Sequence, residues 1–146
     1  MAHYVTSVPT RLSVDAAFAY MSDMEHFSEW DPGITRVRRV SGDGVAIGTA
    51  WDVTVKTVGT TVMRYAVREC DSPRRILLVS RTPFVTSVDE ITVAATETGS
   101  VVTYDAILTL NGPLRIFDRL LARAFRIIGD RGAAGLRRVL SAKSAA

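Results

Sequence analysis

The sequence predicts an α+β fold in which a curved antiparallel sheet of about seven strands is wrapped around one long C-terminal helix. Three observations lead to this prediction. Residues 112–140 place apolar side chains at steps of three and four, which is typical of an amphipathic helix. Residues 34–110 alternate between polar and apolar positions with period two, which is typical of strands with one buried face. Short turns rich in Gly, Pro, Asp and Ser separate these strands, so they are expected to pair antiparallel.

The N-terminal part contains the first strand and two short helices. The expected elements are a strand over 3–10, a helix over 14–21, a short helical turn over 22–29 and a chain turn over 30–33. Pro9 is expected to end the strand, because proline has no N–H to donate to a neighbouring strand. Ser13 is the predicted N-cap of the helix, and Asp15 lies in its first turn, where the helix dipole favours negative charge.

Six further strands are expected before the long helix. They span 34–41, 48–58, 62–70, 75–81, 86–95 and 101–110. The long helix is expected to run from Gly112 to about Leu140, with Pro113 at its first position and a frayed tail over 141–146.

Counting with period two assigns one face of each strand to the interior, beneath the helix. The residues expected to line an apolar space there are Trp51, Met63, Tyr65, Asp89 and Tyr104 from the sheet and Phe117, Leu121 and Phe125 from the helix. An apolar pocket with a few polar groups is typical of small-molecule sites. For the two tyrosines, two interpretations remain open. Their hydroxyls contact a ligand, or they are core aromatics whose hydroxyls reach the rim.

Asp89 is the most informative residue, because it shares its face of the strand with Ile91 and Val93. A buried charge is costly, so this carboxylate should be paired, protonated or solvated by a cavity. One interpretation is an acid/base or ligand-orienting group with a raised pKa, which makes Asp89 the candidate catalytic residue. The other is a β-bulge, or a salt bridge to Arg64 or Arg81 after a one-residue slip in strand register.

Three glycines, Gly129, Gly132 and Gly135, lie inside the predicted long helix. Each costs about 1 kcal/mol relative to alanine, so their presence needs a reason. They leave space for a ligand beneath the helix, allow close packing on the sheet, or produce a kink near Gly129.

No pattern in the sequence indicates a metal, a cofactor or a catalytic nucleophile. His3 and His26 are the only histidines, and neither has a second His or Cys at ligand spacing. The glycine-rich stretch 42–48 has one residue too many for a dinucleotide fingerprint and joins two predicted strands. Cys70 has no obvious base nearby, and the chain has no Gly-x-Ser-x-Gly motif. We therefore expect no metal and no cofactor.

The composition favours one globular domain over residues 1–146. The chain is 47% apolar and 23% charged, with a net charge of +3, and the arginines that dominate the basic residues are spread along strands and a helix face. This distribution argues against nucleic-acid binding. The N-terminus has no basic segment followed by an apolar run, and no apolar stretch approaches 20 residues. We therefore expect a cytoplasmic protein without an integral membrane segment, either a monomer or a homodimer.

The chain resembles the START-like (SRPBCC) superfamily over essentially its whole length, and specifically the polyketide cyclase/dehydratase and lipid-transport group of small bacterial proteins. The resemblance is carried by SVDAAFAYMSD (13–23), EWDPG (29–33), GTAW (48–51), DSPRR (71–75) and the terminal helix with Gly135 and Leu136. It implies a helix-grip fold with a pocket between sheet and helix. It implies no single reaction, because members bind lipids, sterols, quinones or polyketides.

These expectations lead to three hypotheses. The first is a binding protein that holds a hydrophobic small molecule (a lipid, polyketide or quinone-like compound) between sheet and helix. The alternative is a cyclase or dehydratase, in which Asp89 and a tyrosine transfer a proton in the same cavity. The third is an interaction module that uses a sheet edge or a helix end.

Overall fold

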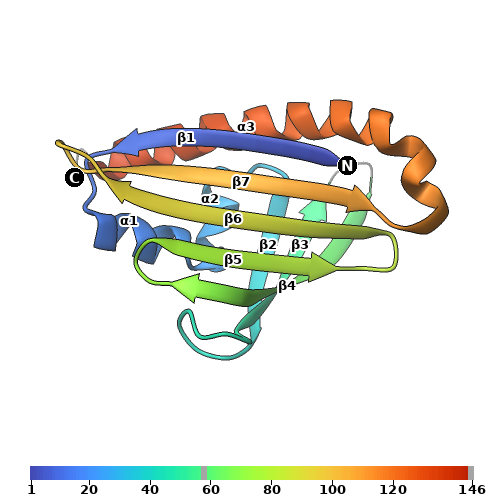
Figure 1. Ribbon diagram of the computed structural model, residues 1–146, viewed down its shortest axis with the longest axis horizontal. Helices are drawn as coiled ribbons and strands as arrows, with labels where there is room; N and C mark the ends of the chain where they lie inside the picture. The colour runs from blue at the N-terminus through green and yellow to red at the C-terminus, as the bar shows by residue number, and fades with distance from the viewer. Residues whose placement is uncertain (57–58, 145–146) are drawn as a thin grey trace.

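The computed structural model describes residues 1–56 and 59–144 and confirms the predicted fold (Figure 1). One antiparallel sheet has the strand order β1-β7-β6-β5-β4-β3-β2. The strands are β1 (Ala2–Thr10), β2 (Ile34–Ser41), β3 (Ala50–Lys56), β4 (Thr60–Asp71), β5 (Arg75–Arg81), β6 (Val85–Ala95) and β7 (Ser100–Leu110). Strands β2 to β7 therefore form a meander, and β1 pairs with β7 at one edge. Pro9 is tolerated inside β1 because an edge strand leaves one side of its backbone unpaired.

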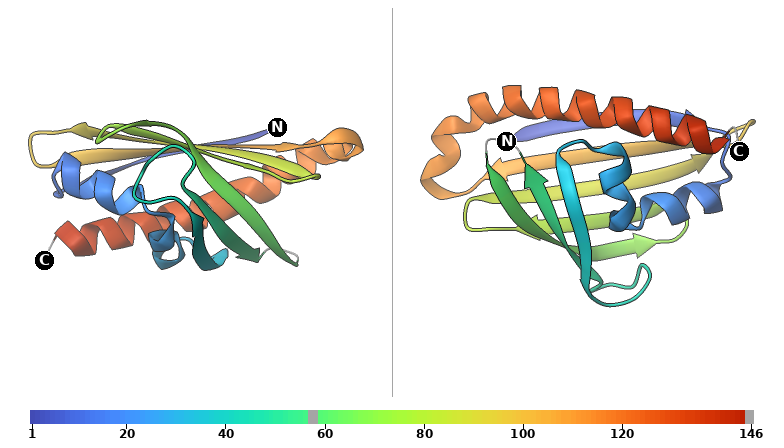
Figure 2. Two further views of the ribbon diagram at one scale, coloured as in Figure 1. Left: turned by 90° about the horizontal axis from the view of Figure 1, so that it is seen from below. Right: turned by 180° about the vertical axis from the view of Figure 1, so that it is seen from behind.

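The helical segments cover one face of the sheet (Figure 2). They are α1 (Val14–Met21), the 3₁₀ segment η1 (Met24–His26), α2 (Phe27–Trp30), the 3₁₀ segment η2 (Gly112–Phe117) and α3 (Asp118–Ser144). Ser13 caps α1 as predicted, because its hydroxyl accepts the N–H of Ala16 at 3.1 Å. Within the described ranges, no helix combines the length and the apolar character needed to cross a membrane.

The predicted long helix differs from the observed one at both ends. It begins with the 3₁₀ segment η2 and becomes an α-helix only at Asp118. The predicted frayed tail over 141–146 is wrong for residues 141–144, which continue α3, because Leu136 and Leu140 anchor this end in the core. Residues 145–146 lie outside the described residues, as does the predicted end of the third strand at 57–58.

Only the second half of α3 is well packed, although the periodicity predicts a buried face along the whole helix. The side chains of Ile116 and Leu120 are 80% and 67% exposed, whereas Leu136 is 1% exposed. Figure 1 shows the first turns of this segment beyond the end of β7, where no strand faces them. An apolar spacing identifies the residues that share a face, but burial also requires an element on the other side.

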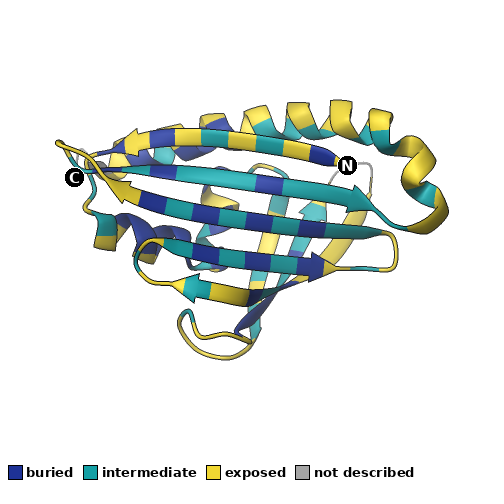
Figure 3. Cartoon of the chain, viewed as in Figure 1, coloured by how far each residue is buried: buried dark blue, intermediate teal, exposed yellow. Residues whose placement is uncertain are grey.

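The core lies between the strands and the helical layer. Its fully buried side chains include Met21, Phe27, Trp51, Ile76, Leu78, Ile91 and Leu140. Figure 3 shows buried and less buried residues alternating along β5 and β6, as expected for strands with one face on a core.

Two glycines of α3 are explained by close packing. A Cβ atom on Gly135 would lie 1.9 Å from the carbonyl oxygen of Trp30, and one on Gly129 would lie 2.4 Å from the ring of Tyr4. Gly132 has more room, since the nearest atom to its Cβ would be a ring carbon of Trp30 at 3.6 Å. The glycines therefore let α3 approach the end of α2 and the edge strand β1.

Candidate functional site

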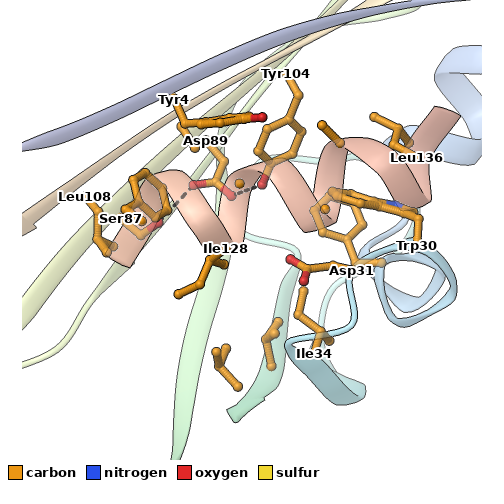
Figure 4. A pocket seen from close by; sticks show the side chains of 18 of the residues that line it. Tyr4, Trp30, Asp31, Ile34, Ser87, Asp89, Tyr104, Leu108, Ile128 and Leu136 are labelled. Carbon is orange, nitrogen blue, oxygen red and sulfur yellow. Dashed lines mark hydrogen bonds between the residues drawn. The ribbon is translucent and has the colours of Figure 1, made fainter. Parts of the chain in front are cut away.

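A pocket lies between the concave face of the sheet and α3 (Figure 4). Its volume is about 160 Å³, which is room for about five waters at the ~30 Å³ that each occupies in the liquid. Its apolar lining consists of Met24, Phe27, Trp30, Ile34, Val53, Val55, Met63, Ala106, Leu108, Phe125, Ile128, Ala133 and Leu136. Ile34, Val55, Leu108, Phe125 and Ile128 are only half-buried, so they mark the more open side of the pocket.

A chain of four polar side chains crosses the pocket wall from β4 to β7. The Tyr65 hydroxyl donates to Ser87 Oγ at 2.9 Å, and Ser87 Oγ donates to Asp89 Oδ1 at 2.9 Å. The Tyr104 hydroxyl donates to Asp89 Oδ2. Strand register brings these residues together, because Ser80 pairs with both Tyr65 and Ser87, and Asp89 pairs with Ala106 beside Tyr104. All four face the pocket.

Asp89 is an unusually weak acid for a carboxyl group. Burial raises its pKa from 3.8 to about 6, and the negative charges of Asp31 and Asp105 add to the rise. The hydrogen bonds from Tyr104 and Ser87 oppose it, because they favour the ionised form. At neutral pH the group is therefore mostly ionised and able to take up a proton.

The salt-bridge and bulge explanations of Asp89 are wrong. Its strand β6 pairs with β5 and β7 without a register shift. Arg64 instead binds Asp52 on the other face of the sheet, with its Nε 2.8 Å from Asp52 Oδ1. Asp89 forms no salt bridge within residues 1–56 and 59–144.

A second carboxyl group, Asp31, enters the pocket from the turn between α2 and β2. Its Oδ1 accepts the N–H of Gly33 at 2.9 Å, while Oδ2 has no hydrogen bond to any residue that the structure describes. Burial raises the pKa of Asp31, against the lowering effect of the Gly33 N–H. Figure 4 shows Asp31 and Asp89 entering the pocket from different elements on opposite sides.

The structure brings together five of the eight site residues predicted from the sequence. Met63, Tyr65, Asp89, Tyr104 and Phe125 line the pocket. The tyrosine hydroxyls do not reach a rim, because they are bonded to Ser87 and Asp89.

The other three predicted residues, Trp51, Phe117 and Leu121, lie away from the pocket lining. Trp51 is fully buried in the core, and Val53 and Val55 further along β3 line the pocket instead. Phe117 is 49% exposed in η2, beyond the end of the sheet.

Some lining residues were not predicted as site residues from the sequence, and they differ in how strong a sequence signal they carry. Tyr4 lies on the same face of β1 as the inward residues Ala2 and Val8, so the period-two pattern contained its signal. Ile128 falls on the apolar spacing of α3. Asp31 carried no signal beyond a turn, because the direction of a turn side chain depends on the packing of both flanking elements.

Within the described ranges, no group of three His, Cys, Asp or Glu side chains comes together in a way that could hold a metal ion. The polar side chains that line the pocket, Asp31, Asp89 and the tyrosines around them, can form hydrogen bonds and transfer protons.

Replacing Tyr104 by phenylalanine is expected to raise the pKa of Asp89 above its value of about 6. The change removes the hydroxyl that donates to Asp89 Oδ2 and stabilises its ionised form. Titration of the Asp89 carboxyl carbon by NMR measures the effect. Tyr20→Phe is the matched control, because the Tyr20 hydroxyl binds Glu29. An unchanged or lower Asp89 pKa in Tyr104→Phe would contradict the assigned hydrogen bond.

The profile of one protein family matches nearly the whole chain. It is described as "Polyketide cyclase / dehydrase and lipid transport" and matches residues 1–141. No curated protein sequence matches the chain at a significant level.

Several solved structures share the fold at low sequence identity. A START superfamily protein from Mycobacterium smegmatis has 14% identity and a TM-score of 0.77, with 96% of this chain and 97% of that chain covered. The di-domain aromatase/cyclase StfQ of the steffimycin biosynthetic pathway has 14% identity and a TM-score of 0.73, with 99% of this chain covered. The alignment covers 51% of StfQ, so this chain spans about half of its length. XoxI from Bacillus cereus has 18% identity and a TM-score of 0.71, with 96% of both chains covered.

Proposed function

Because the chain belongs to the polyketide cyclase / dehydrase and lipid transport family, we propose that it binds a hydrophobic small molecule in the pocket between its sheet and α3. The observation that carries this proposal is the pocket itself. Its wall is mostly aliphatic and aromatic, and a few polar groups gather on β4, β6 and β7. Sites for small organic ligands have this combination, because the apolar wall provides binding free energy and the polar groups fix orientation. A lipid, a polyketide or a quinone-like compound fits this description.

The pocket provides a direct test through Ile128, which lines it from α3. Ile128→Trp is expected to fill the more open side and to weaken binding of a neutral apolar probe, phenylbutanol, by about tenfold or more, as judged by isothermal titration calorimetry. Ile127→Trp is the matched control, because Ile127 is 53% exposed and lies outside the lining. The control should bind the probe within about twofold of the unmodified protein. Equal affinities of the two variants for the probe would refute the proposal.

Native mass spectrometry of gently purified protein, together with a screen of lipid extracts, would identify what occupies the pocket. We expect a bound species of low molecular mass that Ile128→Trp loses and Ile127→Trp retains.

The second candidate function is a cyclase- or dehydratase-type reaction in the same pocket. Asp89, with its pKa raised to about 6, favours it, because a general acid/base works best when its pKa is near the working pH. A pocket of this shape would also hold a flexible chain in one reactive conformer. On a substrate that the protein turns over, Asp89→Asn should reduce kcat by about 100-fold or more. Unchanged turnover would exclude this mechanism.

A further inference from the structure

The charged side chains that line the pocket are of one sign. They are the carboxyl groups of Asp31 and Asp89, and no Lys, Arg or His belongs to the lining. The chain as a whole carries a net charge of +3. The negative character of the pocket is therefore a local arrangement and does not follow from the composition.

The hydroxyl protons along the polar wall are already used. Tyr65 donates to Ser87, Ser87 donates to Asp89, and Tyr104 also donates to Asp89. Each oxygen of an ionised carboxylate accepts about two hydrogen bonds. Asp89 therefore keeps free acceptor capacity, and Asp31 Oδ2 accepts from no described residue. Of the other lining hydroxyls, Tyr4 donates to Asp130, and only Thr6 on β1 has no acceptor among the described residues. The polar wall therefore offers a ligand mainly carboxylate oxygens, which need hydrogen-bond donors.

The indole N–H of Trp30 is not a hydrogen-bond donor to the ligand position between Asp31 and Asp89. Its nitrogen is buried and has no partner among the described residues. Figure 4 shows this nitrogen on the side of the ring away from Asp31 and Asp89.

Aromatic rings border the same part of the pocket. The ring of Trp30 lies edge-on to Tyr104 with centroids 5.5 Å apart, and Phe27 lies 4.9 Å from Trp30 and 6.1 Å from Tyr104. The faces of aromatic rings attract cations, most strongly where water is excluded. Carboxylates and aromatic rings at one pocket favour the same kind of guest.

We propose that the pocket selects a compact apolar molecule that carries a protonated nitrogen, a lipophilic amine, with its nitrogen directed at Asp89 and Asp31. This inference rests on the proposed function, because it requires that the pocket binds a ligand. An ammonium group supplies the missing donors and neutralises a buried negative charge. A carboxylate ligand would face two carboxyl groups without a cation, and a neutral ligand would leave their charge uncompensated.

Four probes with the same phenyl-alkyl body separate these possibilities: phenylbutylamine, phenylbutanol, phenylbutyrate and butylbenzene. We expect phenylbutylamine to bind at least about tenfold more tightly than phenylbutanol at pH 7.5. Phenylbutyrate should bind most weakly of the four. Calorimetry gives the affinities, and backbone amide shifts around Trp30 and Ile128 place each probe in the pocket.

Two variants link the preference to the carboxylates. Asp89→Asn should lower the affinity for phenylbutylamine by about tenfold or more and leave the affinity for phenylbutanol within about twofold of the unmodified protein. Asp31→Asn provides the same test should Asp89→Asn fold poorly. Asp105→Asn is the matched control, because Asp105 follows Tyr104 on β7, lies on the other face and binds His3 at 2.7 Å. The control should keep the amine preference.

The affinity of the amine should also fall as the pH decreases through about 6, since protonation of Asp89 removes its charge. The titratable groups facing Asp89 are Asp31 from the α2–β2 turn, Tyr65 from β4 and Tyr104 from β7, with Asp105 contributing through the sheet. Tyr4 of β1 also lines the pocket, and its hydroxyl donates to Asp130. The lining residues of α3 carry no titratable side chain.

The possible failures are distinguishable. If none of the four probes binds, the pocket is not a ligand site and both proposals fail. If phenylbutanol, butylbenzene or phenylbutyrate binds as tightly as the amine, the proposed function stands and the amine selectivity is wrong. An amine preference that survives both Asp89→Asn and Asp31→Asn also overturns the assignment.

Discussion

Gly135→Ala is expected to lower the free energy of unfolding by about 3 kcal/mol or more. The new Cβ would lie 1.9 Å from the carbonyl oxygen of Trp30, 2.9 Å from its carbonyl carbon and 3.3 Å from its Cα. All three are backbone atoms at the end of α2, so no side-chain rotation relieves the clash. Either α3 moves away from α2 or the turn that carries Asp31 shifts. The gain in helix propensity, about 1 kcal/mol, is too small to compensate.

Gly132→Ala provides the control within the same helix. Its Cβ would meet nothing closer than 3.6 Å, which is ordinary van der Waals contact. The substitution should therefore raise the free energy of unfolding by up to about 1 kcal/mol, because alanine is the better helix former. Urea denaturation of both variants measures the difference. Similar effects at the two positions would show that α3 does not pack on the Trp30 backbone as described.

This contact matters for the pocket, because Trp30 and Asp31 follow each other in the chain. The backbone of Trp30 supports Gly135 of α3, its ring lines the pocket, and Asp31 carries one of the two carboxyl groups. The position of α3 and the position of Asp31 therefore depend on one contact.

The sheet side of the pocket was predictable from the sequence. Tyr65, Asp89 and Tyr104 were placed correctly because strict alternation fixes the face of each residue, and β6 pairs in register with both neighbours. Alternation does not fix the position along the strand that lies under α3. For this reason Trp51 was assigned to the pocket, whereas Val53 and Val55 of the same strand line it.

The helix side and the turns were less predictable. Phe117 and Leu121 follow the apolar spacing of the predicted helix, but Phe117 is 49% exposed and Leu121 only half-buried. Spacing carries no information about a facing element. The close approach of Gly135 to Trp30 joins residues about a hundred positions apart, so no local pattern distinguishes it from the other glycines. The position of Asp31 depends on that same contact.

In the protein without a ligand, the ionised carboxylate of Asp89 lowers the free energy of unfolding at neutral pH. Its pKa is about 6 in the folded state against an ordinary value of 3.8, and this difference corresponds to roughly 3 kcal/mol. Between these pH values the folded state binds more protons than the unfolded state, so its stability falls as the pH rises. The contribution of the neutral carboxyl group is complete below about pH 4 and lost above about pH 6. A buried ionisable group that lowers stability in this way is typical of a functional site.

Asp89→Asn should therefore raise the free energy of unfolding by roughly 2 to 3 kcal/mol at pH 8 and change it by less than about 1 kcal/mol at pH 4. The carboxamide has nearly the same shape, its oxygen can accept from Tyr104, and it carries no charge to desolvate. Chemical denaturation at the two pH values, taken as a difference from the unmodified protein, cancels the titration of the other carboxyl groups. Asp105→Asn, a partly exposed neighbour on β7, should change stability by no more than about 1 kcal/mol at either pH. If Asp89→Asn instead destabilises the protein at pH 8, the ionised carboxylate stabilises the fold, and the case for Asp89 as a group maintained for a ligand is lost.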